Sequence, residues 1–186
     1  MKNEQSKINQ PKSQTEVDQT VLDFLGNFKI NEPDDLIPLI KHIKDSLEFR
    51  EYNKQTAAHA DSIQWKRTVS QILQDGYVYQ GKACSDLSMI LVALCKALGL
   101  EAQLVKLVNL PKDNSHSITE IKINGEWYRI DPDFSDPKPI KGYWEADQVL
   151  NKNWAGGWKV WKRGDDLWSM GLDGIDKEEL ICREEE

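Results

Sequence analysis

The spacing of apolar residues predicts two helices in the first quarter of the chain. Residues 15–28 carry apolar side chains three and four positions apart, and Thr15 is the expected N-cap of this helix. A second helix is expected to open near Pro33, with the acidic side chains of Asp34 and Asp35 in its first turn. The folded part of the chain is therefore expected to begin with amphipathic helices.

Two further helices follow in the pattern. One is expected over Asp61–Leu73 and is ended by the Asp-Gly pair at residues 75–76. The next begins at Cys84 and ends where Gly99 takes the C′ position. One face of it carries four leucines: Leu87, Leu91, Leu94 and Leu98. This helix is better defined than those before it.

The apolar pattern changes from a helical to an alternating period after Gly99. Strands are expected over residues 104–108, 118–123 and 127–130, and the Asn-Gly pair at residues 124–125 is a strong hairpin signal. Helices first and antiparallel strands later predict an α+β domain, in which helices pack on a small antiparallel sheet.

The segment that follows Asp131 is rich in Pro, Gly and Trp and shows little periodicity. We expect it to be ordered but irregular. Trp144 and Trp158 are candidates for the edge of a substrate groove. Tryptophans in such segments more often cover a core, so both interpretations stay open.

Charge and length narrow the classes of function. The 186 residues include 24 basic and 31 acidic ones, a net charge of −7, which disfavours nucleic acid and anionic membranes as partners. The N-terminus lacks the apolar region of a signal peptide, and no stretch approaches the roughly 18 apolar residues of a transmembrane helix. A cytoplasmic protein is expected, with a disordered tail at 1–15, one domain at 16–175 and an acidic tail at 176–186.

Three cysteines without CxxC spacing indicate reduced thiols rather than a disulfide framework or a zinc knuckle. Cys84 opens a helix, where unpaired backbone N–H groups and the helix dipole lower the pKa of a thiol. That placement suits a nucleophile, and the alternative is a small buried apolar side chain. Cys95 lies about 16 Å further along the helix and is assigned to the core, and Cys182 to the tail.

His116 is the candidate base for such a thiolate. The expected hairpin brings Asp131 back beside it, because the two positions are nearly equidistant from the turn. The alternative for Asp131 is a residue that ends a strand and forms an Asx turn. The other histidines, His42 and His59, fall at polar positions. A metal site that includes Cys84 would have suitable ligand types without paired ligand spacing, so no metal is expected.

As a set, these residues resemble the transglutaminase-like superfamily over about residues 33–135. The matching segments are 81–86, 97–100, 116–120, 125–127 and 130–132. The resemblance implies a papain-like α+β core and acyl transfer through a thioester, with Cys84 as nucleophile, His116 as general base and acid, and Asp131 orienting the imidazole. Ala and Ser flank the cysteine here, where animal transglutaminases have Gln and Trp, which argues against that branch.

The expected function is that of a thiol hydrolase of peptide or isopeptide amide bonds, acting on a peptide or protein without metal or organic cofactor. A transamidase is a variant of the same mechanism, and a non-catalytic module that binds a peptide or protein is the alternative. The backbone N–H of Cys84 is one expected oxyanion donor, and Gln80, Tyr79 and Trp65 are candidates for the other. The oligomeric state stays open.

Overall fold

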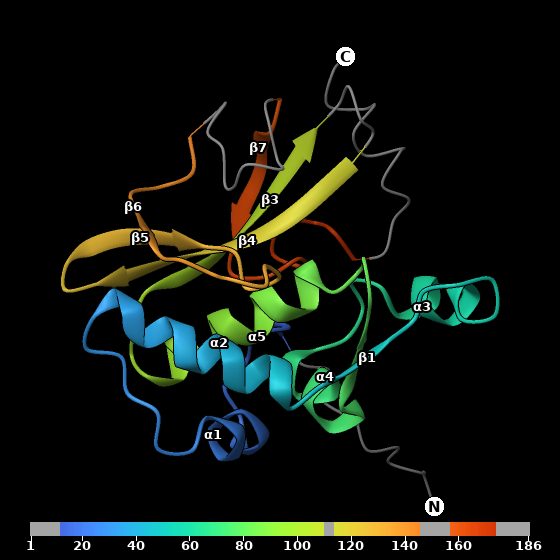
Figure 1. Ribbon diagram of the computed structural model, residues 1–186, viewed down its shortest axis with the longest axis horizontal. Coiled ribbons are helices and arrows are strands. Elements are labelled where there is room, and N and C mark those ends of the chain that lie inside the picture. Colours follow the sequence, from blue (N-terminus) through green and yellow to red (C-terminus); the bar gives the residue numbers. More distant parts are fainter. Residues whose placement is uncertain (1–11, 110–113, 146–156, 174–186) are drawn as a thin grey trace, which may run out of the picture.

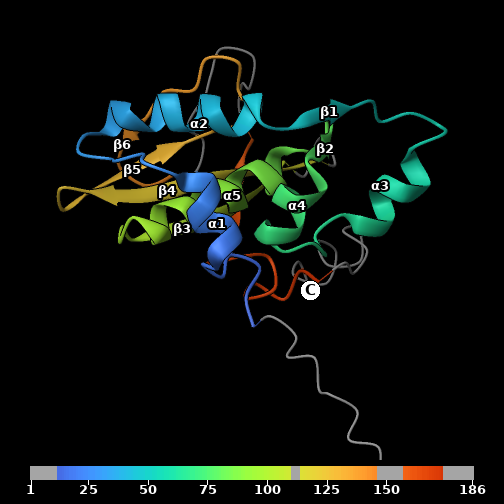
Figure 2. The same cartoon turned by 90° about the horizontal axis from the view of Figure 1, so that it is seen from below.

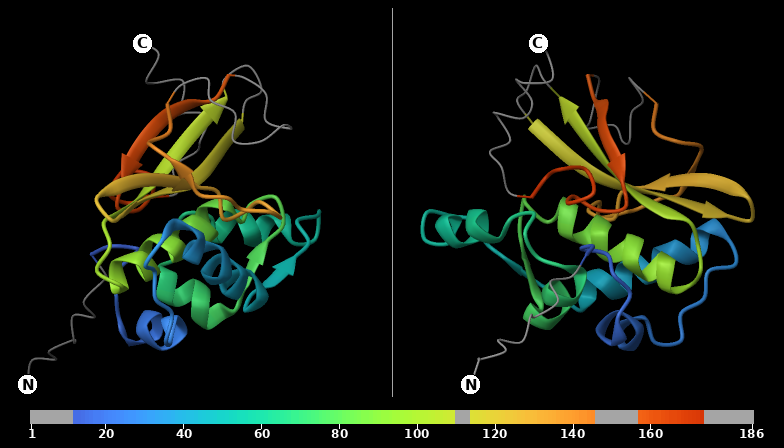
Figure 3. Two further views of the ribbon diagram at one scale, coloured as in Figure 1. Left: turned by 60° about the vertical axis from the view of Figure 1, so that its left-hand side comes forward. Right: turned by 180° about the vertical axis from the view of Figure 1, so that it is seen from behind.

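Two layers make up the structure, a computed structural model that describes residues 12–109, 114–145 and 157–173. A five-stranded antiparallel sheet forms one layer, with strand order β6-β5-β4-β3-β7, and most of the helices form the other (Figures 1 and 3). The α+β prediction is confirmed.

The elements have the following bounds. The helices are α1 (Gln19–Leu25), the 3-10 helix η1 (Pro33–Asp35), α2 (Leu36–Asp45), α3 (Ala57–Ile63), α4 (Val69–Asp75) and α5 (Cys84–Ala97). The strands are β1 (Glu48–Arg50), β2 (Tyr77–Tyr79), β3 (Ala102–Asn109), β4 (Asn114–Ile123), β5 (Glu126–Ile130), β6 (Ile140–Lys141) and β7 (Lys159–Gly164).

The first helices lie close to their predicted positions. A turn of 3-10 helix opens at Pro33 and continues into α2, as expected for proline in a first turn. Thr15, however, is not an N-cap. The cap of α1 is Asp18, whose carboxylate accepts a hydrogen bond from the N–H of Val21, while the Thr15 hydroxyl accepts one from Lys96.

The single helix expected over Asp61–Leu73 is wrong, because the chain forms α3 and α4 there. Between them Trp65 has a φ of +65°, a left-handed conformation that interrupts a right-handed helix. Thr68 then caps α4 by accepting a hydrogen bond from the N–H of Gln71. The helix α3 lies apart from the other helices, at one end of the molecule (Figure 2).

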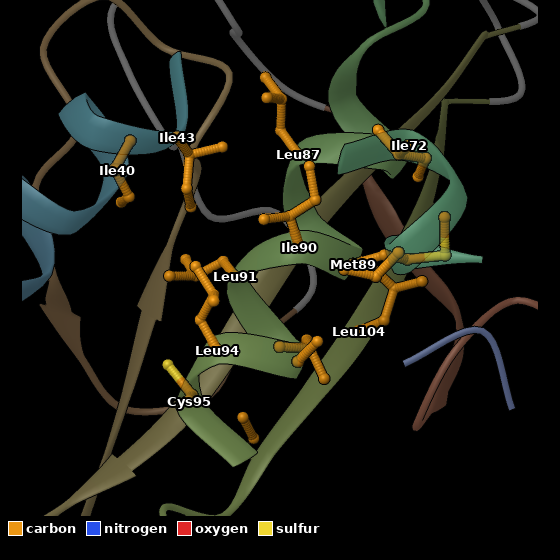
Figure 4. Close-up of a cluster of buried hydrophobic side chains, with 14 of the residues drawn as sticks. Ile40, Ile43, Ile72, Leu87, Met89, Ile90, Leu91, Leu94, Cys95 and Leu104 are labelled. Atoms are coloured by element: carbon orange, nitrogen blue, oxygen red, sulfur yellow. The ribbon is translucent and has the colours of Figure 1, made fainter. Parts of the chain in front are cut away.

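The central helix α5 confirms its prediction in both bounds and burial. Figure 4 shows it between α2, which contributes Ile40, and β3, which contributes Leu104. Leu91 and Leu94 are fully buried, and burying a leucine typically contributes about 1.5–3 kcal/mol. Gly99 ends the helix with a φ of +78°, as expected of a C′ glycine.

The hairpin of β4 and β5 also confirms its prediction. Asn124 and Gly125 form its turn with φ values of +53° and +82°, the positive values that a two-residue hairpin turn requires. Pairing runs from Ile123 opposite Glu126 to Thr119 opposite Ile130. Because β5 ends at Ile130, it does not pair with the first half of β4, before Thr119.

The segment after Asp131 is more regular than expected. Within the described part of it, β7 adds an antiparallel strand to β3, and β6 adds one to β5. The parallel pair β1 and β2 was not predicted either. Trp144 and Trp158 pack on the outer face of the sheet with apolar side chains of β3 and β4, in a second core: Val105, Leu107 and Ile118.

The expected tail at residues 1–15 is wrong at its C-terminal end. Gln14 is fully buried, and its amide N–H groups donate to the carbonyls of Trp65 and Arg67, each at 2.9 Å. Asp166 accepts hydrogen bonds from the Ser13 hydroxyl and the Gln14 N–H. Polar contacts hold this segment, so its lack of apolar residues misled the prediction. Residues 1–11 and the tail at 176–186 lie outside the described residues.

No helix in the described ranges has the length and apolar character needed to cross a bilayer.

Candidate active site

Cys84 is the first residue of α5 and is partly exposed. A tight turn precedes it, in which the N–H of Lys82 donates to the carbonyl of Tyr79 and Gly81 has a φ of +71°. The helix thus begins at the thiol, where its first N–H groups lack partners within the helix. This confirms the predicted location of Cys84 at a helix N-terminus.

His116 and Asp131 meet beside the half of β4 beyond the end of β5. The two side chains are buried, and the His116 Nε2 lies 2.5 Å from the Asp131 Oδ2. The other oxygen of Asp131 accepts a hydrogen bond from the N–H of Asp133 at 2.9 Å. The predicted contact between imidazole and carboxylate is therefore confirmed, and the Asx-type bond of the alternative is present as well.

The thiol of Cys84 is hydrogen-bonded to the same imidazole. Because Nε2 faces Asp131, Nδ1 is the ring nitrogen left for the sulfur. The three residues therefore form one chain of hydrogen bonds, from the start of α5 through β4 to the end of β5.

The charges around Cys84 and His116 favour an ion pair between the thiolate and the imidazolium. Burial raises the pKa of Cys84, but the hydrogen bond and charge of His116, together with the charge of Lys106, outweigh it and lower the pKa to about 7. Burial lowers the pKa of His116, and its bonds to Asp131 and Cys84 outweigh that and raise it well above its usual value. Near neutral pH the pair therefore favours thiolate and imidazolium.

Two aromatic rings flank the imidazole. The ring of Phe134 is stacked at 6.5 Å from the His116 ring, and that of Trp158 meets it edge-on at 6.2 Å, measured between centroids. Lys44 of α2 donates to the carbonyls of Asp133 and Phe134, which ties the loop after β5 to the helical layer. These contacts restrict the position of the histidine ring.

Two charged residues near Cys84 were missed by the sequence analysis. Asp133 follows Asp131 closely, and burial raises the pKa of its carboxyl. Lys106 of β3 is 1% exposed and lies below the start of α5. A signal for it did exist, because a lysine at the centre of the apolar run 104–108 falls at a position where burial is expected.

Arg67 is a third such residue, and it anchors the start of α5. Its guanidinium donates to Asp86 at 2.6 Å, to Asp75 at 3.0 Å and to the carbonyl of Tyr77 at 3.2 Å. The side chain is 8% exposed and that of Asp86 15%, so the ion pair between these two is largely shielded from water, whereas Asp75 is 41% exposed. No local pattern predicts this contact, since Arg67 and Asp86 lie in different elements.

The oxyanion candidates occupy different places. Gln80 is exposed, and its side-chain amide donates to the carbonyl of Phe49. Trp65 and Tyr79 are buried and line a small cavity beside the start of α5, which Lys82 also lines. The structure therefore brings two of the three candidates toward this end of the helix and leaves Gln80 engaged elsewhere.

The tryptophan candidates also differ. Trp158 contacts His116, whereas Trp144 is 2% exposed and packs on the outer face of the sheet. Both tryptophans belong to the core on the outer face of the sheet, and their candidacy for the edge of a substrate groove stays a prediction. Cys95 is buried, which raises the pKa of its thiol to about 12, and Cys182 lies outside the described residues. Across the described ranges, no group of three or more His, Cys, Asp or Glu side chains is arranged to hold a metal ion.

Comparisons with solved structures return similar folds of low identity. A crystal structure from Cytophaga hutchinsonii, provisionally named a cysteine protease, has 17% identity and a TM-score of 0.38, over 84% of this chain and 51% of that one. A protein described as a TGase has 13% identity and a TM-score of 0.48, over 80% and 38%. Legionella pneumophila LapG has 17% identity and a TM-score of 0.43, over 88% and 84%.

This chain thus spans about half of the first of these proteins and less than half of the second. A search of curated proteins finds no significant match. The sequence profile of the transglutaminase-like superfamily matches residues 31–132, a span that begins just before α2 and ends just after Asp131. That match covers more than half of the chain, which therefore belongs to the transglutaminase-like superfamily.

Proposed function

We propose that this protein is a cysteine hydrolase that cleaves amide bonds of peptide or isopeptide type through a thioester intermediate. Cys84 is the nucleophile, His116 the general acid and base, and Asp131 the residue that orients the imidazole. The observation that carries the proposal is the chain of hydrogen bonds through these three residues at the N-terminus of α5. This is the arrangement of nucleophile, base and orienting acceptor that acyl transfer requires.

The first half of the reaction uses the ion pair as it stands. The Cys84 thiolate attacks the carbonyl carbon, a C–S bond forms, and the π electrons move onto the oxygen. As the tetrahedral intermediate collapses, the C–N bond breaks and the imidazolium of His116 gives its proton to the departing nitrogen. The products of this half are a free amine and a thioester on Cys84.

The second half returns the enzyme to its starting state. Neutral His116 takes a proton from water, the hydroxide oxygen attacks the thioester carbon, and the C–S bond breaks. The acyl group leaves as a carboxylic acid, which releases its proton to the solvent, and Cys84 is again a thiolate beside an imidazolium. An amine that takes the place of water would instead give a new amide.

Asp131 and the helix terminus support both halves. The short bond from Asp131 holds the imidazole so that Nδ1 faces the sulfur, and it stabilises the cation that forms there. The backbone N–H of Cys84, at the start of α5, is the oxyanion donor that we propose. Trp65 or Tyr79, rather than Gln80, is the better placed candidate for the second donor.

The test is labelling of the full chain with a peptide that carries a thiol-reactive acyl group, followed by intact mass and peptide mapping. We expect one label per chain, on Cys84, and release of that label as an acid in water or as an amide when a primary amine is added. The Cys95→Ala variant is the matched control and should label normally, since that thiol is buried. Labelling that ignores Cys84 would contradict the proposal and favour a binding module.

A further inference from the structure

A polar cluster lies inside the helix-sheet layer directly beneath the proposed nucleophile. It consists of Ser85 of α5, Lys106 of β3 and Ser117 of β4, and all three side chains are buried. The Lys106 ammonium donates to the Ser117 hydroxyl at 2.9 Å and to the Ser85 hydroxyl at 3.3 Å, and the two hydroxyls lie 2.8 Å apart. The same ammonium lies 4.8 Å from the centre of the Trp65 ring.

Two members of the cluster are sequence neighbours of the two proposed reacting residues. Ser85 directly follows Cys84, and Ser117 directly follows His116. Alternation along β4 turns Ser117 toward α5, while His116 contacts Trp158 on the other face of the sheet. The cluster therefore connects the first turn of α5 to β4 at the point where thiol and imidazole meet.

Two further hydrogen bonds between α5 and β4 strengthen this connection. The hydroxyl of Ser88, one turn further along α5, donates to the carbonyl of Ser117 at 3.2 Å, and the hydroxyl of Thr119 donates to the carbonyl of Ser88 at 3.3 Å. The helix and the strand are thus held by polar contacts at their catalytic end. Apolar packing takes over further along α5.

Burial makes the cation of this cluster effective. In a site shielded from water, the field of an ammonium group is screened far less than at the surface. The groups whose charges act on Cys84 are His116 and Lys106, which lower the pKa of the thiol, and Asp133, which raises it. Two cations thus oppose one carboxylate and the cost of burial.

The cluster itself is not a second catalytic centre. A serine with a lysine partner can act as a nucleophile in other enzymes, but Ser117 is fully buried and Ser85 is 2% exposed. A substrate carbonyl cannot approach either hydroxyl there. The cluster instead acts on the adjacent thiol of Cys84 through the charge of Lys106.

We propose that Lys106 is a positioning residue for Cys84: its buried ammonium, held by Ser85 and Ser117, keeps the sulfur in the thiolate form and fixes the start of α5 against the strand of the base. The inference rests on the proposed function, since it assigns a partner to that nucleophile. It adds a second cation to the reacting pair, from a strand outside the triad.

Two substitutions test it in the full chain. Lys106→Met removes the charge and the hydrogen bonds but keeps a side chain of similar length. Lys106→Gln removes the charge and keeps an amide that can donate to the serines. We expect both to slow alkylation of Cys84 by iodoacetamide about tenfold near pH 6, because one nearby charge shifts a pKa by about one unit or more. Near pH 9 the rates should approach those of the wild type.

Lys122→Met is the matched control, because it removes a lysine of β4 that is paired with Glu101 at the surface. It should leave the pH profile of Cys84 unchanged. Thermal melting verifies that each variant folds. If both Lys106 variants fold and alkylate with the wild-type pH profile, the inference is overturned and the proposed function stands.

Failure of the proposed function gives a different result. If Cys84 of the wild-type protein does not react near pH 6, it holds no thiolate there. The proposed function is then contradicted, and Lys106 has no thiolate to stabilise. If neither Lys106 variant folds, the cation belongs to the stability of the fold, and the inference is likewise overturned. A Gln variant that keeps its fold and loses only the reactivity near pH 6 supports it most directly.

Discussion

The two ends of α5 carry one cysteine each, and the two thiols behave as opposites. At the N-terminal end Cys84 is partly exposed and hydrogen-bonded to His116, and its pKa is lowered to about 7. Eleven residues later Cys95 is buried among apolar side chains, and its pKa is raised to about 12. One helix therefore holds the same chemical group with its pKa lowered at one end and raised at the other.

The comparison shows what a helix supplies and what its neighbours supply. Both cysteines are desolvated, and burial alone disfavours a thiolate at either end. The N-terminal end adds the positive end of the helix dipole, the imidazole of His116 and the ammonium of Lys106. The lowered pKa of Cys84 thus depends on partners from β3 and β4 in addition to the helix terminus.

The largest effect is expected from removing each sulfur in turn. Cys84→Ala should abolish turnover, a loss of about 10⁴-fold or more, because the described part of the chain places no other thiol beside His116. Cys95→Ala should keep turnover near the wild-type level, since its side chain packs in the core. The rate at which each variant hydrolyses a peptide amide measures its turnover. Equal losses in the two variants would contradict a special role for Cys84.

A weaker but still large effect is expected from Asp131→Asn. The amide cannot stabilise an imidazolium as a carboxylate does, and it favours the wrong tautomer, so kcat should fall by about 10²–10⁴-fold with little change in KM. The melting temperature serves as a control for folding. A variant with unchanged kcat would assign Asp131 to the turn alone.

The pH profile of alkylation sharpens the comparison further. Because the pKa of Cys84 is lowered, its thiolate persists below the usual value and is lost only as the pH falls through about 7. Cys95 should remain unreactive up to high pH, since its pKa is raised to about 12. Iodoacetamide rates mapped by mass spectrometry separate the two thiols.

His116→Ala supplies the control for that profile. Loss of the imidazolium should move the inflection of Cys84 upward and leave Cys95 as it was. An unchanged inflection for Cys84 would mean that the hydrogen bond to His116 does not govern the thiol.

The smallest effect is expected from Gln14→Ala, in the segment that precedes α1. The substitution leaves the buried carbonyls of Trp65 and Arg67 without the Gln14 donor, which should lower the free energy of unfolding by about 1–3 kcal/mol. Chemical denaturation measures the loss, and Gln19→Ala, at an exposed position of α1, is the control. No loss at Gln14 would return residues 12–15 to the tail that the sequence predicted.

Local signals predicted the parts of the site that depend on neighbours in sequence. The start of α5 at Cys84 follows from helical periodicity, and the meeting of His116 and Asp131 follows from a two-residue turn that sets the register of a hairpin. The same holds for Gly99, whose position past the last leucine ends the helix. These elements are specified within about twenty residues.

The parts that were missed depend on contacts across the fold. The break at Trp65 joins two helices whose residues read as one periodic run, and the Gln14 side chain binds the carbonyls there from another segment. The strand β7 forms only because the edge of β3 is available. The apolar run around Lys106 indicates its burial, but the serines that bind its ammonium come from α5 and β4, and no local pattern predicts them.

The docked segment at residues 13–15 has a mechanical consequence. Ser13 and Gln14 bind Asp166, and the Thr15 hydroxyl donates to the carbonyl of Asp165 at 3.2 Å, so two stretches about 150 residues apart are fastened together. A pulling force applied beyond both stretches would load these few bonds before it reached the ladders of the sheet. They act as a latch in parallel with the fold, so the contact between Cys84 and His116 would come under tension only after the latch had opened.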